Sequence, residues 1–252
     1  MAINRPLVFV DLDDTLFQTA RKMGDEPRFP ATLDVDGLPN GFMNATQKSF
    51  VEWLLATADV VPVTARSVEA YQRVQLPFVY GAICAHGGVM LSAEGLLDRG
   101  WHARMRSELA HERTRLQRLS EHTLAIGAEL GFSLRGWVVE EQDLAAYVVI
   151  KHNNEADQVL LRVGSEVKSR GLLDGMYVHG NGNNLAFLPQ ALQKRAAVRE
   201  WVSRDQAVNG KRPLLGFGDS VSDLGFMAEC DWWGTPKRGQ LASHVRASVD
   251  HE

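Results

Sequence analysis

The chain has few of the features that mark a secreted or membrane-bound protein. It contains only two cysteines, Cys84 and Cys230, which lie far apart in apolar surroundings. This favours buried free thiols in a reducing compartment over a disulfide framework. No apolar run approaches the length of a membrane span, and the first residues lack the charged and apolar regions of a signal peptide. We therefore expect a cytoplasmic protein with no membrane partner.

An excess of either charge is also missing. Lysine and arginine number 27 against 31 acidic residues, for a formal net charge of -4. This balance leaves no electrostatic footprint for nucleic acid and no polybasic membrane anchor. With 45% hydrophobic and 23% charged residues over 252 positions, the composition is that of a folded globular protein. The length allows one large α/β domain, or a core with a smaller second domain.

The order of apolar segments predicts a parallel sheet. Four short runs are continuously apolar, as in strands buried on both faces; they cover residues 7–10, 59–63, 82–85 and 213–217. Helical segments alternate with the first three runs, which is typical of a doubly wound, Rossmann-like α/β core with right-handed crossovers. Asn44 is placed to cap one of these helices. Residues 18–43 are rich in proline and glycine and predict a long loop, either part of a site or a surface excursion.

Between residues 89 and 188 the pattern changes. A hairpin turning at Glu94-Gly95 precedes one long helix, and two strands, a helix and two more strands follow. The expected elements are the helix at 101–130, strands at 133–140 and 145–151, a helix at 156–170, and strands at 175–180 and 184–188. Helix-strand-strand taken twice predicts a separate α+β layer with an antiparallel sheet. We expect residues 1–88 and 189–252 to form the core and residues 89–188 an inserted domain.

Polar side chains of related chemistry follow the apolar strands at four places. They are Asp11, Asp13 and Thr15; Thr64 and Arg66; Lys194, after the inserted segment; and Asp219 and Asp223. Because parallel strands bring their carboxyl ends to one edge of a sheet, we expect these groups to converge. Clustered carboxylates repel unless a cation or a proton separates them, and Mg²⁺ prefers such oxygen ligands. Hydroxyl, backbone N–H and ammonium groups suit a phosphate.

These segments resemble the four motifs of the haloacid dehalogenase superfamily, in its phosphatase branch. Asp-Leu-Asp-Asp-Thr at 11–15 matches the first motif, and Val-Thr-Ala-Arg at 63–66 is similar to the second. Lys194 stands where the third-motif lysine is expected, and Gly-Asp-Ser-Val-Ser-Asp at 218–223 is similar to the fourth. The α/β insertion between the second and third motifs resembles the cap of the Cof-like subfamily, which includes sucrose-phosphate and other sugar phosphatases.

The resemblance implies a phosphatase that works through an aspartyl-phosphate. Asp11 would be the nucleophile, and Asp13 the general acid for the leaving alcohol and then the base that activates water. Thr64 would bind the transferring phosphoryl group. Lys194 would neutralise charge on Asp11 and on the phosphate.

The implied cofactor is Mg²⁺. Asp219 would ligate it together with Asp11 and the backbone carbonyl of Asp13, with Asp223 in support. The implied partner is a small phosphorylated metabolite, such as a sugar phosphate. Candidate substrate contacts are Thr15, Arg66, His86, Gly87 and Asn183.

Several alternatives stay open on the residues themselves. Arg66 could touch the substrate phosphate or pair with a carboxylate, His86 could be a hinge histidine, and Asn183 lies in a segment with turn character. Three departures from the family pattern, at Ala65, Ser222 and His86-Gly87-Gly88, concern substrate positioning rather than the reaction. A phosphomutase or phosphotransferase could use the same intermediate. A non-catalytic phospho-acceptor, such as a receiver domain, would also carry an acidic cluster with lysine, but without an inserted cap.

Overall fold

The computed structural model describes residues 5–153, 156, 158–180 and 182–249. It forms two compact units, which we call the core unit (residues 1–99 and 193–252) and the cap unit (residues 100–192). The cap unit is an insertion in the core unit, with its own sheet. Within the described residues, no helix has the length and apolar character that crossing a membrane requires.

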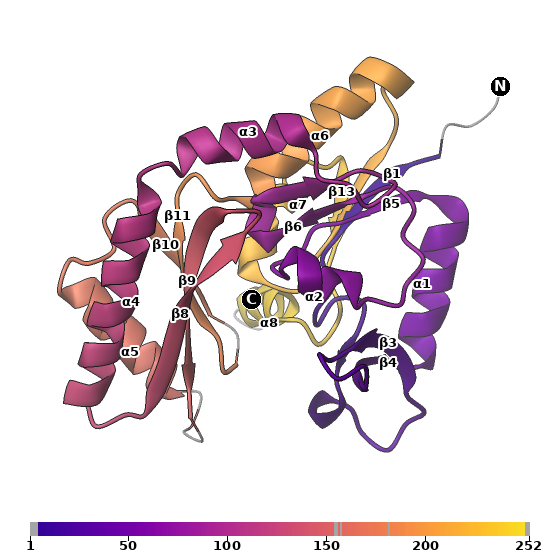
Figure 1. Ribbon diagram of the computed structural model, residues 1–252. Coiled ribbons are helices and arrows are strands. Elements are labelled where there is room, and N and C mark those ends of the chain that lie inside the picture. Colours follow the sequence, from indigo (N-terminus) through magenta and orange to yellow (C-terminus); the bar gives the residue numbers. More distant parts are fainter. Residues whose placement is uncertain (1–4, 154–155, 157, 181, 250–252) are drawn as a thin grey trace. The chain divides into compact units, whose positions relative to one another are not determined.

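The core unit is built on a four-stranded parallel sheet in the order β13-β12-β1-β5 (Figure 1). The strands are β1 (Leu7–Val10), β5 (Asp59–Pro62), β12 (Leu214–Phe217) and β13 (Trp232–Gly234). The chain passes from β1 to β5 on one side and returns later to β12 on the other. The carboxyl end of β1 therefore lies at a switch point, where open α/β sheets bind their ligands. The predicted fold class is confirmed.

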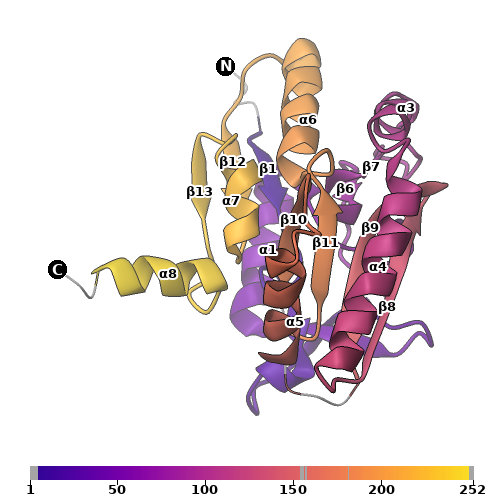
Figure 2. The same cartoon turned by 90° about the vertical axis from the view of Figure 1, so that its left-hand side faces the viewer.

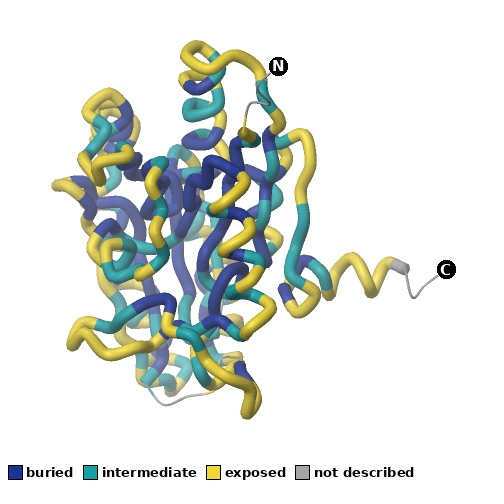
Figure 3. The backbone as a smooth tube through the Cα atoms, turned by 90° about the vertical axis from the view of Figure 1, so that its right-hand side faces the viewer, coloured by how far each residue is buried: buried dark blue, intermediate teal, exposed yellow. Residues whose placement is uncertain are grey.

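Helices connect these strands. They are α1 (Ala45–Thr57), α2 (Val68–Gln72), α6 (Lys194–Asn209), α7 (Leu224–Met227) and α8 (Gln240–Val249). Asn44 caps α1 as expected: its side chain accepts a hydrogen bond from Gln47 N, and the Gln47 side chain accepts from Asn44 N. Strands β1 and β5 are buried throughout, dark blue in Figure 3, whereas α8 is mostly exposed.

Two sequence-based expectations for the core are wrong. The segment 18–43 is not a loop but a three-stranded antiparallel sheet of β2 (Gln18–Thr19), β3 (Phe29–Leu33) and β4 (Pro39–Met43). Its proline and glycine residues sit within the short strands or at their turns. The third predicted strand, β6 (Ala82–Cys84), pairs antiparallel with β7 (Val89–Leu91) and meets the main sheet through one bridge, from Ile83 to Val63.

Trp232 and Trp233 lie on the edge strand β13, where they are 63% and 50% exposed. An edge strand has no neighbour on one side to cover its side chains, so its indole rings stay largely in solvent.

The cap unit is a four-stranded antiparallel sheet in the order β10-β11-β9-β8, with helices along it (Figure 2). Its strands are β8 (Leu134–Glu141), β9 (Leu144–His152), β10 (Met176–Gly180) and β11 (Leu185–Pro189). Helices α4 (Glu112–Glu129) and α5 (Gln158–Ser169) pack on the sheet around a core that includes Leu116, Val148 and Phe187. This agrees with the predicted antiparallel layer.

The single long helix expected at 101–130 is wrong. The chain forms α3 (Arg99–Glu108) and then α4, with a turn at 109–111 between them. Leu109 remains buried in that turn, at 5% exposure. Neither proline nor glycine marks the break, so tertiary packing rather than local propensity ends α3.

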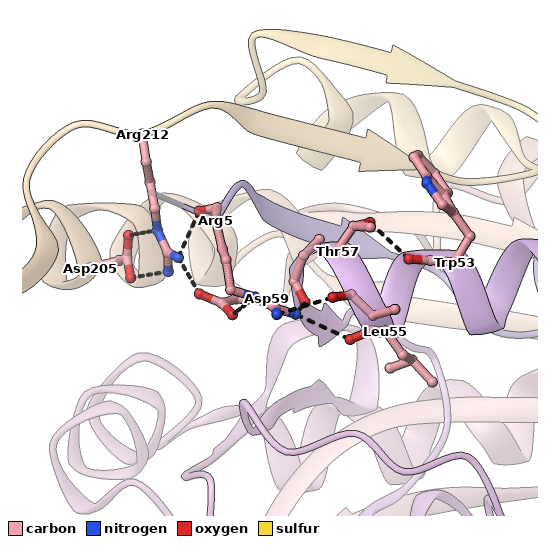
Figure 4. A network of polar contacts seen from close by, with 9 residues as sticks. Arg5, Trp53, Leu55, Thr57, Asp59, Asp205 and Arg212 are labelled. Atoms are coloured by element: carbon pink, nitrogen blue, oxygen red, sulfur yellow. Dashed lines mark hydrogen bonds and ion pairs between the residues drawn. The ribbon is translucent and has the colours of Figure 1, made fainter. Parts of the chain in front are cut away.

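A network of buried charges lies at the amino-terminal end of the core sheet (Figure 4). The Arg212 guanidinium donates to both oxygens of Asp205 at 2.8 and 2.6 Å and to Asp59. Arg5 donates to the other oxygen of Asp59 at 3.0 Å and to backbone carbonyls at the end of α1. Two cations thus match two carboxylates, and the network joins the starts of β1 and β5 to α6.

Candidate active site

Three aspartates from separate segments converge at the carboxyl edge of the core sheet. Asp11 directly follows β1, Asp219 follows β12, and Asp223 ends the short 3-10 helix Val221–Asp223. One carboxylate oxygen of each lies within 4.8 Å of the other two, and all three residues are buried. Asp11 N donates to Phe217 O at 2.8 Å, so β1 and β12 stay in register up to the site. The sequence-based expectation of convergence agrees with this geometry.

Lys194 is the cation of this cluster. It is the first residue of α6, and its ammonium donates to Asp11 Oδ1 and to Asp223 Oδ1, both at 2.7 Å. The ammonium also lies 5.7 Å from the centroid of the Phe226 ring. Burial alone would lower the pKa of Lys194, but Asp11 and Asp223 outweigh it and the pKa is raised. Lys194 is therefore held as a cation between two carboxylates.

The negative charges in the cluster outnumber the positive charge. Burial raises the pKa of Asp11 well above its usual range, with Asp223 and Asp219 adding to it against Lys194. Burial, then Asp223 and Asp14, raises the pKa of Asp219 to about 7. Burial acts upward on Asp223 too, but Lys194 and Ser220 prevail and lower its pKa. Asp219 is thus the carboxylate that lacks a compensating cation.

Asp13 is separate from the three-aspartate cluster. Its side chain is 48% exposed, and both of its oxygens accept from Arg66, at 2.7 Å from Nε and 2.8 Å from Nη2. Arg66 in turn donates to Thr32 Oγ1 and lies over the Phe17 ring at 5.3 Å. Of the two alternatives for Arg66, the structure shows the pairing with a carboxylate, that of Asp13. The expected contact of Arg66 with substrate stays a prediction, as does a metal contact through the Asp13 carbonyl.

Thr15 contacts the cluster, and the phosphoryl contact expected of Thr64 stays a prediction. Thr15 Oγ1 donates to Asp11 Oδ2 at 3.2 Å, which fixes the orientation of that carboxylate. Thr64 is 1% exposed, and its hydroxyl accepts from Arg66 N at 3.1 Å. The Thr64 hydroxyl can still donate to a ligand, because accepting one bond leaves its hydrogen available.

Close backbone packing places the last two acids. A Cβ atom at position 218 would lie 2.5 Å from the Cβ of Asp223. Only glycine at this position therefore lets Asp223 reach the cluster without a shift. Ser220 holds Asp223 as well: its backbone N and its hydroxyl donate to Asp223 Oδ2 at 3.1 and 2.7 Å. The Oδ1 atom remains directed to Lys194.

Gly87 has a similar role for Lys194. Its φ of +101° is in the region that favours glycine, and an added Cβ would lie 2.5 Å from the Gln193 carbonyl oxygen. Ala85 and His86, with φ of 50° and 55°, complete the turn. His86 is buried and donates its backbone N–H to Thr64 O at 3.1 Å. The segment thus links the second motif to the start of α6, and substrate contacts by His86 and Gly87 stay predictions.

Asn183 belongs to the cap unit. Its side chain accepts from His152 N at 2.7 Å and donates to His152 O at 3.2 Å, in the manner of a neighbouring strand. Its predicted contact with substrate is not tested by this structure. Asn181, from the same turn motif, lies outside the described residues.

The donor set suits a divalent cation of the magnesium type. Such a cation takes carboxylate oxygens and keeps several waters, and the Asp11, Asp219 and Asp223 oxygens are near enough to share one. Burial, Asp223 and Asp14 raise the pKa of Asp219, and a bound cation would act in the opposite direction. Residues and charge therefore fit the predicted ion.

Sequence reasoning missed three contributors. Phe226 lies beside the Lys194 ammonium, and only its position shortly after the fourth motif could have suggested it. Ser220 and Asp223 form a capping box that the Ser-x-x-Asp spacing signals. Lys22 pairs with Asp14 at 2.5 Å, and both affect the pKa of Asp219. Nothing in the sequence signalled Lys22, since it lies in the segment expected to be a loop.

Comparison with known proteins gives structural matches. No protein-family model matches the chain, and a search of curated proteins finds no match. Among solved structures, a sucrose-phosphatase from Synechocystis in complex with sucrose and phosphate is 19% identical, with a TM-score of 0.57 over 98% of this chain and 88% of that one. The C-terminal domain of a C. albicans trehalose-6-phosphate phosphatase is 11% identical, with a TM-score of 0.59 over 88% and 72%.

A haloacid dehalogenase-like hydrolase from Bacteroides thetaiotaomicron also matches, at 12% identity and a TM-score of 0.51 over 97% of this chain and 100% of that one. These likenesses extend over nearly the whole chain, cap unit included. The chain therefore has the haloacid dehalogenase-like fold, and the resemblance found from the four motifs is confirmed at the level of fold. At these identities the matches show the fold alone, and function has to be argued from the site.

Proposed function

We propose that the protein is a Mg²⁺-dependent phosphomonoester hydrolase that acts through an aspartyl-phosphate. The observation that carries the proposal is the buried arrangement of Lys194 between Asp11 and Asp223, with Asp219 beside them, at the switch point of the sheet. A structural ion cluster would balance its charges, whereas this one is left with an excess of carboxylate. An excess of buried negative charge beside a lysine suits a metal ion that helps bind a phosphate.

In the first step, an Asp11 oxygen attacks the phosphorus atom and the bond from phosphorus to the leaving oxygen breaks. Thr15 donates to Asp11 Oδ2, and Lys194 donates to Asp11 Oδ1. Both bonds orient the nucleophile before substrate arrives. The Lys194 ammonium also offsets the repulsion between the carboxylate and the phosphoryl oxygens. The Thr64 hydroxyl is a donor for one of those oxygens.

Asp13 handles the proton. It gives a proton to the leaving oxygen in the first step and takes one from water in the second, when water attacks phosphorus and releases Asp11 and phosphate. The forked bond from Arg66 fixes the plane of this carboxylate. The residues that would hold Mg²⁺ are Asp11, Asp219 and Asp223; when bound, the ion supplies positive charge that stabilises the phosphoryl oxygens.

For the substrate we propose a small phosphorylated metabolite, in particular a sugar phosphate. Two structures with this fold are described as a sucrose-phosphatase and a trehalose-6-phosphate phosphatase. A third, from Plasmodium falciparum, is an IMP-nucleotidase bound to IMP, at 15% identity and a TM-score of 0.52 over 98% of this chain and 69% of that one. Sugar phosphates and nucleoside monophosphates are therefore the two groups to compare.

The test is Mg²⁺-dependent release of phosphate from a generic aryl phosphate, then from a panel of sugar phosphates and nucleotides. We expect Asp11→Asn to abolish release and Asp36→Asn, an exposed residue in the β3–β4 turn, to keep it. Unchanged turnover by Asp11→Asn would refute the mechanism. Transfer of the phosphoryl group to an added alcohol instead of water would favour the phosphomutase or phosphotransferase alternative. A stable aspartyl-phosphate without turnover would favour a phospho-acceptor.

A further inference from the structure

The cap unit contains a row of arginine and histidine side chains on one helix. Residues His111, Arg115, Arg118 and His122 line one groove of about 320 Å³ beside α4. Arg115, Arg118 and His122 are three and four residues apart, which puts them in a single row along one face of α4. His111 is the residue directly before the helix, at the start of this row.

Little in the described part of the cap unit neutralises this row. Arg115 meets Glu112 at 3.4 Å. For Arg118 the described residues provide no ion pair, and the same holds for the two histidines. Two other arginines of this unit are paired: Arg113 with Glu140, and Arg170 with Glu129 and Glu166.

A row of basic groups spaced three and four residues apart on a helix is unfavourable when no counter-charge lies between them. The simplest interpretation of a helix that carries both arginines and glutamates is a solvated face. That interpretation fits Arg113, whose guanidinium pairs with Glu140. It does not fit Arg118, because this residue lines a groove without an acidic partner.

The groove is open: His111, Thr114, Arg118 and His122 are exposed at its surface. Buried Leu119 forms part of its lining on α4, and Leu172, from the turn after α5, lies on the other side. Thr114 adds a hydroxyl at the rim. The turn also approaches closely: the position of a Cβ at Gly175 would lie 3.4 Å from the Arg115 guanidinium. The volume is at the lower end of that of ligand pockets.

We propose that this groove, which we call the α4 groove, binds a small phosphorylated anion. Guanidinium groups bind phosphate oxygens in a forked geometry, and imidazole N–H groups and a hydroxyl complete such a shell. Arg115 and Arg118 are three residues apart on α4, so their two guanidinium groups can bind both ends of an anion with two phosphate groups. The proposal does not depend on the proposed phosphatase activity, since every residue that it uses lies in the cap unit.

The experiment is isothermal titration calorimetry of the full chain with pyrophosphate, and with inorganic phosphate as a second probe, in EDTA and at fixed ionic strength. We expect saturable binding, tighter for pyrophosphate. Arg118→Gln should weaken it roughly tenfold or more, since a charge-assisted hydrogen bond is lost. The matched control is Arg113→Gln, on the same helix but outside the groove, which should bind as the unmodified protein does.

A second variant, His122→Gln, removes another member of the row from an exposed position and should also weaken binding. Circular dichroism of each variant checks that the helix persists. The proposal is overturned if the unmodified protein shows no saturable heat. It is also overturned if Arg118→Gln and Arg113→Gln bind equally, because the anion would then be bound elsewhere, for instance at Lys194.

Discussion

Asp219→Asn should stabilise the protein while removing its response to Mg²⁺. Asp219 is 7% exposed and has Asp223 and Asp11 as neighbours, while the only ammonium of the described cluster is engaged by those two. Burial and the neighbouring carboxylates therefore make ionisation of the Asp219 side chain unfavourable in the folded protein. Asparagine has nearly the same shape and carries no charge.

The magnitude follows from the pKa of Asp219, which rises from 3.8 to about 7 on folding. A carboxyl whose pKa is raised in the folded state loses its proton more readily in the unfolded state. Stability is therefore lost as the pH rises from about 4 to about 7, and the loss is complete above that range. The difference corresponds to roughly 4 kcal/mol at about pH 8. Near pH 5 it is less than half of that, because the folded carboxyl is still protonated while the unfolded one is mostly ionised.

The assay is urea unfolding of the original protein and of Asp219→Asn in EDTA, at about pH 5 and about pH 8. The stability advantage of the variant should be roughly 2 kcal/mol or more larger at the higher pH. Comparing two pH values cancels the constant cost of burying an amide. Saturating Mg²⁺ should raise the stability of the original protein at about pH 8 and leave the variant nearly unchanged. An advantage that does not depend on pH would refute the electrostatic reasoning.

Three further changes test other parts of the core unit. Arg66→Gln should lower kcat about tenfold or more, because it releases Asp13, and should have little effect on Mg²⁺-dependent stabilisation. Arg66→Lys should restore kcat only in part, because lysine cannot form the forked pair of hydrogen bonds. Steady-state kinetics measures the first effect and thermal melts with Mg²⁺ the second. Arg212→Met should cost about 3–5 kcal/mol in urea unfolding, because buried Asp205 loses its cation and Asp59 keeps only Arg5. An intact stability would show that the network is dispensable. Gly87→Ala should reduce both stability and activity by displacing the carbonyl of Gln193, and a variant with normal kinetics would show that the turn before α6 tolerates the shift.

The parts of the fold that the sequence predicted well are those in which one face is fully buried. β1 and β12 are continuous apolar runs that end in aspartate, and their pairing follows from burial alone. The segment 18–43 was mistaken for a loop because its strands are short, partly exposed and contain Pro30 and Pro39. The break at 109–111 was missed because no local residue signals it.

In the candidate site, too, some features could be predicted from the sequence and others could not. Residue types at strand ends predicted the meeting of Asp11, Asp219 and Lys194, since topology alone brings strand ends together. Which carboxylates Lys194 and Arg66 bind could not be predicted. Lys194 could have met Asp13 as readily as Asp223, and Arg66 could have been left for the substrate. These choices depend on the close approach at Gly218 and on the turn at Gly87, which are properties of the packed backbone.

The two charged clusters of the core unit differ in a way that distinguishes structure from function. At the amino-terminal edge of the sheet, Arg5 and Arg212 match Asp59 and Asp205, so charge is balanced and every partner is satisfied within the chain. At the carboxyl-terminal edge, the aspartate cluster has three carboxylates and one ammonium. A fold gains nothing from the second arrangement by itself, because buried like charges oppose folding. Its persistence at the point where such sheets bind ligands is explained if a cation and a phosphate complete it.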